Sequence, residues 1–336
     1  MLLKIGLFAL ISLSIYLGIA AGLILSNPPQ KAVPSTGRPD PIDFTTLITA
    51  DYANIPGLQP YTARDQATLY YRQYPSQAPT HKVLVLLHGS GWHSMQFHPL
   101  AAFVSQHGLA HVITPDLRGH GFSPQVRGDV AYVGQLEDDL ADLLAEVRQQ
   151  HPGAQIIVGG HSSGGGLAIR FAGSRYGSQA NAYLLLAPFL KYNAPTTQPN
   201  SGGWARPLSR RIAGLSMLNQ LGVRWLNHLT VIQFAMPQAV LEGPLGDSAT
   251  TAYSYRLNTS FAPRSHYGRD LAALQQPFLL AAGLDDQAFI ATQYEPVIAQ
   301  FTPSGSYVLL PGVGHVDLLT TPQLEPRLVE WLSSLP

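Results

Sequence analysis

GGHSSGGG, from Gly159 to Gly166, is the stretch that decides the fold of this chain. It ends an apolar run, QIIVGG at 155–160, and precedes LAIRFAGSRY at 167–176, a segment compatible with a helix. Neither a phosphate-binding loop nor a dinucleotide-binding loop fits, because no lysine followed by serine or threonine is present and G-x-G-x-x-G does not occur. A strained turn carrying a reactive serine remains, with a purely structural glycine turn as the alternative.

Two adjacent serines compete for the reactive position in this turn. Gly160 to Gly164 fits G-x-S-x-G, in which the serine sits between a strand and a helix and bulk two residues away on either side would clash. Ser162 has glycine at both of those positions, whereas Ser163 has His161 on one side. The pattern therefore predicts Ser162 as the nucleophile, above a helix N-terminus that favours negative charge.

A serine hydroxyl is a weak nucleophile and needs a base that is oriented by an acid. Where such an elbow occurs, the acid and the histidine follow the serine along the chain. His315 follows the apolar run SYVLLPG at 306–312, in the glycine-rich GVGH. Asp285 and Asp286 follow another apolar run, PFLLAAG at 277–283. We expect His315 as the base and Asp286 as the orienting acid, with Asp285 as the alternative.

Two backbone N–H groups must stabilise the oxyanion of the transition state. One is expected from Ser163, directly after the nucleophile. The other is expected from the loop after KVLVLLHG at 82–89, with Ser90 as the donor and Gly91 as the alternative. A metal site is a poor interpretation of this region, because its histidines recur at steps of five residues: His88, His93 and His98.

Five motifs in this order resemble an α/β-hydrolase of the lysophospholipase, monoacylglycerol lipase and serine aminopeptidase group. They are LHGSG at Leu87, PDLRGHGFS at Pro115, GGHSSGG at Gly159, GLDD at Gly283 and GVGH at Gly312. The resemblance covers roughly residues 60–188 and 270–336, and it implies a cofactor-free serine hydrolase. In PDLRGHGFS, structural support is the better interpretation for Asp116, Arg118 and His120.

Strand and helix signals alternate along the chain, which predicts an α/β fold with a mostly parallel central sheet flanked by helices. Apolar runs at 67–74, 82–89, 111–116, 155–160 and from Tyr183, Pro277 and Ser306 read as strands. An apolar stripe predicts a helix from Asp129 to Gln150. No strong strand appears between Pro188 and Arg269. We therefore expect a core at 58–188 and 270–336, with a mainly helical lid or cap inserted at 189–269.

The N-terminus carries 21 uncharged residues from Ile5 to Leu25, preceded by Lys4. Roughly 30 Å of helix would result, enough to cross a bilayer. We expect residues 1–25 to be a single-pass anchor with a cytoplasmic N-terminus and an extracytoplasmic catalytic domain. Cleavage as a signal peptide, giving a secreted or periplasmic protein, is the alternative. Proline-rich residues 26–57 read as a linker.

Composition excludes several classes of function. The 336 residues include 46% hydrophobic and 12% charged residues, with no net charge and no cysteine. Disorder, nucleic-acid binding, disulfides and thiolate metal sites are therefore not expected. The oligomeric state is not specified by any pattern.

The expected cap indicates the kind of substrate. No acidic residue occurs from Asn181 to Leu241, but apolar residues alternate with five cations: Lys191, Arg206, Arg210, Arg211 and Arg224. Such a cap beside a membrane anchor favours lipid-like carboxylic esters such as monoacylglycerol or lysophospholipid. A peptidase or amidase on the same triad is the first alternative, and a non-catalytic membrane-tethered binding protein is the second. Ordinary packing would also explain the apolar residues.

Overall fold

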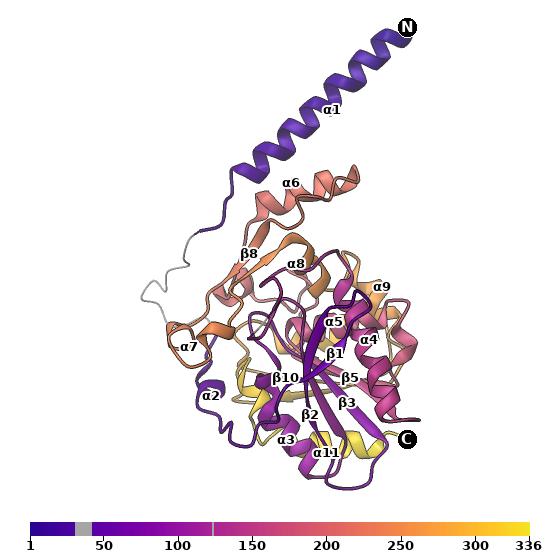
Figure 1. Cartoon of the computed structure of the whole chain (residues 1–336), viewed down its shortest axis with the longest axis vertical. Coiled ribbons are helices and arrows are strands. Elements are labelled where there is room, and N and C mark those ends of the chain that lie inside the picture. The colour runs from indigo at the N-terminus through magenta and orange to yellow at the C-terminus, as the bar shows by residue number, and fades with distance from the viewer. Residues whose placement is uncertain (31–41, 123) are drawn as a thin grey trace.

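The computed structural model describes residues 1–30, 42–122 and 124–336 (Figure 1). Its centre is a sheet in the order β1-β2-β4-β3-β5-β6-β10-β11. Strand β2 pairs antiparallel with both β1 and β4, and all neighbours from β4 to β11 pair parallel. The strands are β1 Gln59–Thr62, β2 Thr68–Tyr74, β3 Lys82–Leu87, β4 His111–Asp116, β5 Gln155–His161, β6 Ala182–Leu186, β10 Phe278–Gly283 and β11 Gly305–Leu310. The expected mostly parallel sheet is confirmed.

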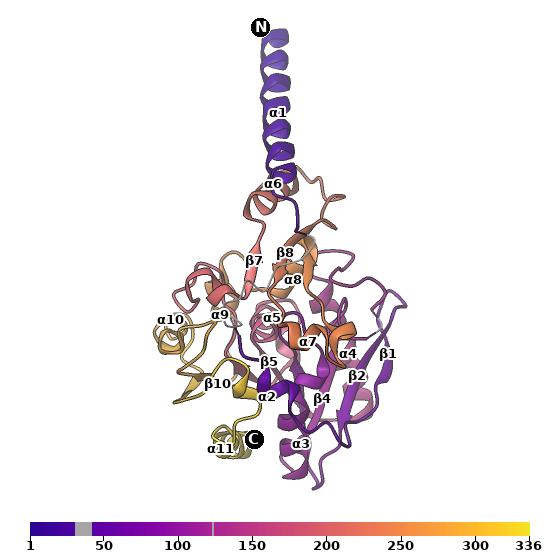
Figure 2. The ribbon, with the colours of Figure 1, turned by 90° about the vertical axis from the view of Figure 1, so that its left-hand side faces the viewer.

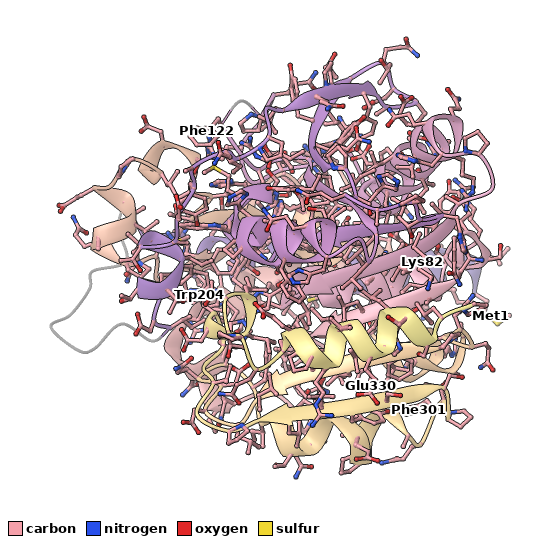
Figure 3. The ribbon with its side chains drawn as sticks, turned by 90° about the horizontal axis from the view of Figure 1, so that it is seen from below. Met1, Lys82, Phe122, Trp204, Phe301 and Glu330 are labelled. Carbon is pink, nitrogen blue, oxygen red and sulfur yellow. The ribbon has the colours of Figure 1, made fainter. Side chains whose placement is uncertain are left out.

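The inner strands form because their apolar runs are buried on both faces of the sheet. Val83 to Leu87 in β3 and Leu184 to Leu186 in β6 have no exposed surface. Helices cover both faces, with α4 Gln135–Gln150 and α5 Ser163–Ala172 on one and α3 His98–Gln106 and α11 Glu325–Ser334 on the other (Figures 1 and 3). Lys82, labelled in Figure 3, donates to the Leu332 carbonyl oxygen in α11 at 2.6 Å.

Helix α4 begins six residues later than the apolar stripe predicts. The sequence indicates a start at Asp129, whereas the structure places Gly134, with φ +104°, immediately before the helix. A positive φ is incompatible with an α-helix, so the helix cannot extend backwards through this residue. Asp129 instead accepts hydrogen bonds from the Arg256 guanidinium at 2.6 and 2.7 Å. The end of the helix at Gln150 agrees with the prediction.

Residues 189–269, the expected mainly helical cap, contain more helix than strand, but they also include strands that the sequence did not predict. This segment is called the cap here. It contains a three-stranded antiparallel sheet in the order β7-β8-β9, formed by Ala205–Pro207, Thr230–Phe234 and Ala252–Ser254. Strands of three to five residues leave too short an alternation to be recognised in the sequence. Its helices are α6 Ser209–Gln220, α7 Gln238–Leu241, α8 Tyr255–Phe261 and the start of α9 Tyr267–Ala272. Helix α10, Tyr294–Ile298, belongs to the core.

The N-terminal helix α1, Leu2–Leu25, extends away from the rest of the molecule (Figure 2). By length and composition it could cross a membrane, although a signal sequence passes the same test. Residues 31–41 of the expected linker lie outside the described residues. The remainder of that stretch is not a simple linker, because Ile42, Phe44 and Leu47 are buried around α2, Thr45–Ile48. These side chains cover the region described next.

Candidate active site

Ser162 lies between β5 and α5 in a backbone conformation that few non-glycine residues adopt, with φ +56° and ψ −122°. The turn is held at both sides by the end of β6 and the chain that follows it. The Ser162 N–H donates to the Leu186 carbonyl oxygen, and the Phe189 N–H donates to the Ser162 carbonyl oxygen, both at 2.9 Å. Such strained residues persist only where neighbouring structure holds them, and they are frequent at functional sites.

The glycines on either side of Ser162 are required by space. A Cβ on Gly160 would lie 2.3 Å from the carbonyl carbon of Gly164. A Cβ on Gly164 would lie 2.0 Å from the carbonyl oxygen of Leu87, at the end of the neighbouring strand β3. No side chain fits at these distances. The spacing that singled out Ser162 in the sequence therefore corresponds to a close approach of three backbone segments.

Asp286 and His315 are brought together by the loops that follow β10 and β11. The His315 Nδ1–H donates to Asp286 Oδ2 at 2.8 Å, and both side chains are buried. Asp286 Oδ1 accepts from the backbone N–H groups of Ala288 and Phe289 at 2.7 and 2.8 Å. Asp285, the alternative acid, is exposed. The two loops approach so closely that a Cβ on Gly283 would lie 2.0 Å from the Val313 carbonyl oxygen.

Three side chains that the sequence did not single out contact His315. His161 packs against it with ring centroids 4.5 Å apart, and its Nε2–H donates to the His315 carbonyl oxygen at 3.0 Å. Burial, together with the nearby His315, holds the pKa of His161 well below its usual value, so its ring is neutral. Phe289 meets the His315 ring edge to face, and Gln287 Oε1 accepts from the His315 N–H at 3.0 Å.

Ser90 and Ser163, the residues whose N–H groups are the expected oxyanion donors, are in contact: their hydroxyl oxygens are 2.5 Å apart. Ser163 is the first residue of α5, so its N–H has no hydrogen-bond acceptor within the helix. The N–H of Gly91, the alternative donor, is occupied: it donates to Tyr253 Oη at 2.7 Å. This geometry favours Ser90 over Gly91 for the second position.

Tyr253 links the cap to this loop through a buried relay. The His120 Nδ1–H points to the carbonyl oxygens of Leu117 and Arg118, at 3.3 and 3.1 Å, which leaves Nε2 free to accept. The Tyr253 hydroxyl donates to that Nε2 at 2.6 Å while accepting from Gly91. Tyr253 comes from β9, more than 130 residues after His120, and no local pattern in the sequence pairs them.

The remaining polar residues of PDLRGHGFS support the structure, as expected, with Ser123 outside the described residues. Asp116 Oδ1 accepts from the Ser94 N–H at 2.8 Å, and Arg118 forms ion pairs with Asp139 at 2.8 Å and Asp65 at 3.0 Å. None of these atoms belongs to the cavity at Ser162. They fasten the loop that carries His120.

His88, His93 and His98 are not gathered at a metal. His88 Nε2 accepts from the Leu117 N–H at 3.0 Å, His93 Nε2 pairs with Ser248 Oγ at 2.9 Å, and His98 Nδ1 pairs with Tyr74 Oη at 3.2 Å. Across the residues that the structure describes, no group of three His, Cys, Asp or Glu side chains could hold a metal ion. Each histidine has a separate partner within the core.

Ser162, His315 and Ser90 line one small cavity of about 20 Å³. That volume holds about one water molecule. Its other walls are mostly apolar, and no acidic residue is among them: Ile42, Phe44, Leu47, Gly89, Trp92, Gln96, His161, Trp204, Val316 and Leu319. Phe44 lies 5.4 Å from Trp92 and 5.5 Å from Trp204, measured between ring centroids, so the three rings close the site. A cavity of about 270 Å³ beside Leu117 to His120 contains none of the expected catalytic side chains.

Sequence comparison assigns the family, since the serine aminopeptidase S33 family matches residues 78–316. The chain belongs to this α/β-hydrolase family. Among curated relatives, the monoacylglycerol lipase of Mycolicibacterium smegmatis is 34% identical over 106 residues, which are 32% of this chain and 37% of that protein. The chain therefore aligns with little more than a third of that relative.

Solved structures confirm the fold. A soluble variant of monoglyceride lipase from Saccharomyces cerevisiae has a TM-score of 0.65 at 18% identity and covers 85% of this chain and 97% of its own. A bacterial membrane phospholipase A has a TM-score of 0.57 at 18% identity, covering 99% of this chain and 98% of its own. At these identities the similarity establishes the α/β-hydrolase fold alone.

Proposed function

We propose that this chain is a membrane-anchored serine hydrolase that cleaves carboxylic esters of lipid-like substrates. Ser162 is the proposed nucleophile, His315 the base and Asp286 the acid that orients it. The observation that carries the proposal is the buried His315–Asp286 hydrogen bond of 2.8 Å, with His315 lining the same cavity as the strained Ser162. Because Nδ1–H is donated to Asp286, the His315 ring has its Nε2 lone pair available as a base.

The proposed reaction follows from these positions. His315 Nε2 takes the Ser162 hydroxyl proton as Oγ attacks the ester carbonyl carbon, and Asp286 stabilises the imidazolium that forms. The Ser90 and Ser163 N–H groups stabilise the oxyanion. The alcohol leaves with the proton from His315, and an acyl group remains on Ser162. Water that gives its proton to His315 then hydrolyses this acyl-enzyme.

Lipid-like esters are favoured over peptides by the walls of the cavity. An aminopeptidase needs a carboxylate to hold the substrate ammonium, and the residues that line the cavity include none. The nearest acids of the cap in sequence, Glu242 and Asp247, do not line this cavity. Glu242 instead accepts a hydrogen bond from Gln238 Nε2 on the surface of the cap. Relatives named as monoacylglycerol and monoglyceride lipases also support a lipid ester. The family's description as serine aminopeptidase keeps amide cleavage as the second candidate.

A substrate panel separates these functions. The full chain in detergent would be assayed with a monoacylglycerol, a lysophospholipid, a short p-nitrophenyl ester and an N-terminal prolyl amide, with Ser162→Ala as the blank. We expect hydrolysis of the esters, fastest for the long-chain lipids. Cleavage of the amide alone would overturn the ester assignment. Failure to cleave any of the four would favour the binding protein.

Anchoring is tested separately. We propose that α1 stays attached and spans the bilayer, with its N-terminus in the cytoplasm and the catalytic domain on the other side. The intact mass of the membrane-extracted protein should include residues 1–25, and alkaline carbonate should not release it. A mature N-terminus near Ala21 would instead indicate a cleaved signal peptide.

A further inference from the structure

The cap carries a projection, residues 209–229, that consists of α6 and the loop after it and is called here the cap finger. It packs along the C-terminal half of α1 (Figure 1). Ala20 and Ile24, the buried residues of α1, meet Leu215 and Leu218 of the finger. A Cβ on Gly214 would lie 2.6 Å from the Ala20 carbonyl oxygen, so the two helices touch at their backbones.

Polar contacts hold the same arrangement at three levels. The Tyr16 hydroxyl donates to the Met217 carbonyl oxygen at 3.0 Å, and Arg211 Nε donates to the Ile24 carbonyl oxygen at 3.2 Å. Below the helix, Gln30 and Gln233 exchange two hydrogen bonds of 2.9 and 2.7 Å. The described part of the N-terminal segment up to Gln30 is therefore fastened to the cap.

This docking determines how deep the finger would lie. Leu25 lies nine positions after Tyr16, which at 1.5 Å per residue is about 13.5 Å along α1. If α1 spans a bilayer, as proposed above, the end of the finger that contacts Tyr16 lies within the leaflet on the catalytic side. The finger cannot then be surrounded by water alone.

The exposed side chains of the finger suit that position. Trp225 is 74% exposed and Leu221 is 46% exposed. Arg210 and Arg224 are also exposed, and neither forms an ion pair with a described residue. Tryptophan favours the interface between lipid and water, and arginine extends its guanidinium to the headgroups.

Two polar side chains inside the finger are paired with each other, as an apolar surrounding requires. Asn219 Nδ2 donates to Asn227 Oδ1 at 2.7 Å, and Asn227 Nδ2 donates back to Asn219 Oδ1 at 2.8 Å. This reciprocal amide pair joins α6 to the end of the loop. The exposed surface of the finger carries Ser209, Gln220 and His228 beside its apolar groups and two arginines.

We propose that the cap finger inserts into the bilayer beside α1, with Leu221 and Trp225 below the headgroups and Arg210 and Arg224 on anionic phospholipid headgroups. The proposal rests on the membrane anchor proposed above. Trp204, which lines the Ser162 cavity, lies only five residues before the finger. Lipid contact at the finger therefore acts on the segment that closes the site.

Quenching by brominated lipids tests the insertion. The full chain with Ser162→Ala, which prevents lipid hydrolysis, would be reconstituted in vesicles of phosphatidylcholine and phosphatidylglycerol with brominated acyl chains. We expect part of the tryptophan emission to be quenched, because bromine quenches only at contact. Trp225→Phe should abolish this quenching. The control Trp331→Phe, which removes a buried tryptophan of α11, should retain it.

Equal quenching in the Trp225→Phe variant, or none in any form, would overturn the insertion. An unquenched Trp225 whose emission shifts to the blue as protein concentration rises would assign the finger to a second copy of this chain instead. Intact mass and carbonate extraction of the same sample separate the two proposals. An anchored chain with an unquenched Trp225 contradicts the finger alone. A cleaved chain with a quenched Trp225 contradicts the anchor alone.

A second arm tests the charges. Arg210→Gln with Arg224→Gln should lower the quenching in anionic vesicles to the level seen in pure phosphatidylcholine, because each basic residue near an anionic surface favours binding. Arg269→Gln with Arg327→Gln removes two exposed cations elsewhere and should leave the quenching unchanged. If both double variants show the same quenching in anionic vesicles, the arginines of the finger do not bind headgroups.

Discussion

Ser162 and Ser163 are neighbours with opposite backbone requirements. Ser162 holds a φ of +56°, which costs on the order of 1–3 kcal/mol for a non-glycine residue, whereas Ser163 already begins a helix. The surrounding contacts stabilise this turn, because Gly160 and Gly164 let strands β5 and β3 approach it. Ser162 thus lines the cavity, while Ser163 begins α5.

Asp286 and Asp285 give a direct test of the acid. Asp286→Asn keeps the shape but removes the charge that stabilises protonated His315, so kcat for ester hydrolysis should fall by roughly 10⁴. Asp285→Asn changes an exposed carboxyl and should leave kcat within a factor of two. Steady-state assays on a p-nitrophenyl ester would measure both. A larger decrease in kcat for Asp285→Asn than for Asp286→Asn would assign the orienting acid to Asp285 instead.

Tyr253 is expected to position the loop that carries Ser90. Tyr253→Phe leaves the Gly91 N–H and His120 Nε2 without partners in a buried site, at a cost of about 1–3 kcal/mol. If part of that cost falls on the oxyanion loop, kcat should decrease about tenfold, with little change in KM.

The matched control is Tyr183→Phe, which removes a buried hydroxyl bonded to the Gly177 carbonyl oxygen at the opposite end of the sheet. It should destabilise the fold without lowering kcat. Equal kcat values for the two variants would show that the relay has no influence on catalysis.

The cover formed by residues 42–48 is an element that restricts access to Ser162. Phe44 and Leu47 are buried against the cavity, and Thr46 Oγ1 donates to Asp317 Oδ1 at 3.0 Å, close to His315. The cavity of about 20 Å³ is too small for an ester, so the proposed function requires that this cover or the adjoining Trp204 move to admit one.

Phe44→Ala should widen the mouth and increase kcat/KM several-fold for soluble p-nitrophenyl esters, because less apolar contact holds the cover closed. Phe301→Ala, at a partly exposed phenylalanine remote from the cavity, is the control. A decrease in kcat/KM for Phe44→Ala would show instead that its ring binds substrate.

Most of the central sheet was predictable from its strand-like runs, and the observed bounds of those strands agree with the predicted ones within about two residues. Strand β1, Gln59–Thr62, was not predicted, because QPYT is short and mostly exposed. Gly134 explains the misplaced start of α4, since the apolar periodicity continues through a residue whose backbone cannot be helical. The cap sheet was missed because its strands are short. The cover formed by residues 42–48 was missed because its apolar residues, Ile42, Phe44 and Leu47, are too few to form a periodic pattern in a proline-rich sequence.

The candidate site was predictable where a local motif specifies its backbone. Ser162, Asp286 and His315 each follow a strand, and the parallel sheet places the ends of these strands at one edge. The sequence already favours Ser90 over Gly91, but the contact that supports this preference comes from Tyr253, which is distant in sequence. His161 also escaped notice, because its contact with His315 depends on how two separate loops meet.

The stability of the whole molecule should decrease as the pH falls below neutrality. Burial lowers the pKa of His88 and His93 to about 4, and those of His120 and His161 lie well below 6.5. Between about pH 6.5 and 4 the unfolded chain therefore binds protons that the folded chain does not, which favours unfolding.

Thermal unfolding followed by circular dichroism would measure this effect. The Tm should be constant above pH 7 and fall progressively between pH 6.5 and 5, before most carboxyl groups titrate. A Tm that stays constant down to pH 5 would contradict the neutral, buried state of these four histidines.

The central claim, that one of two adjacent serines is the nucleophile of a membrane-anchored hydrolase, is tested most directly by a fluorophosphonate probe. The full chain in detergent would be labelled, digested and analysed by mass spectrometry. We predict a single adduct on Ser162, absent in Ser162→Ala and present in Ser163→Ala. An adduct on Ser163, or equal labelling of Ser162→Ala and wild type, would contradict the account.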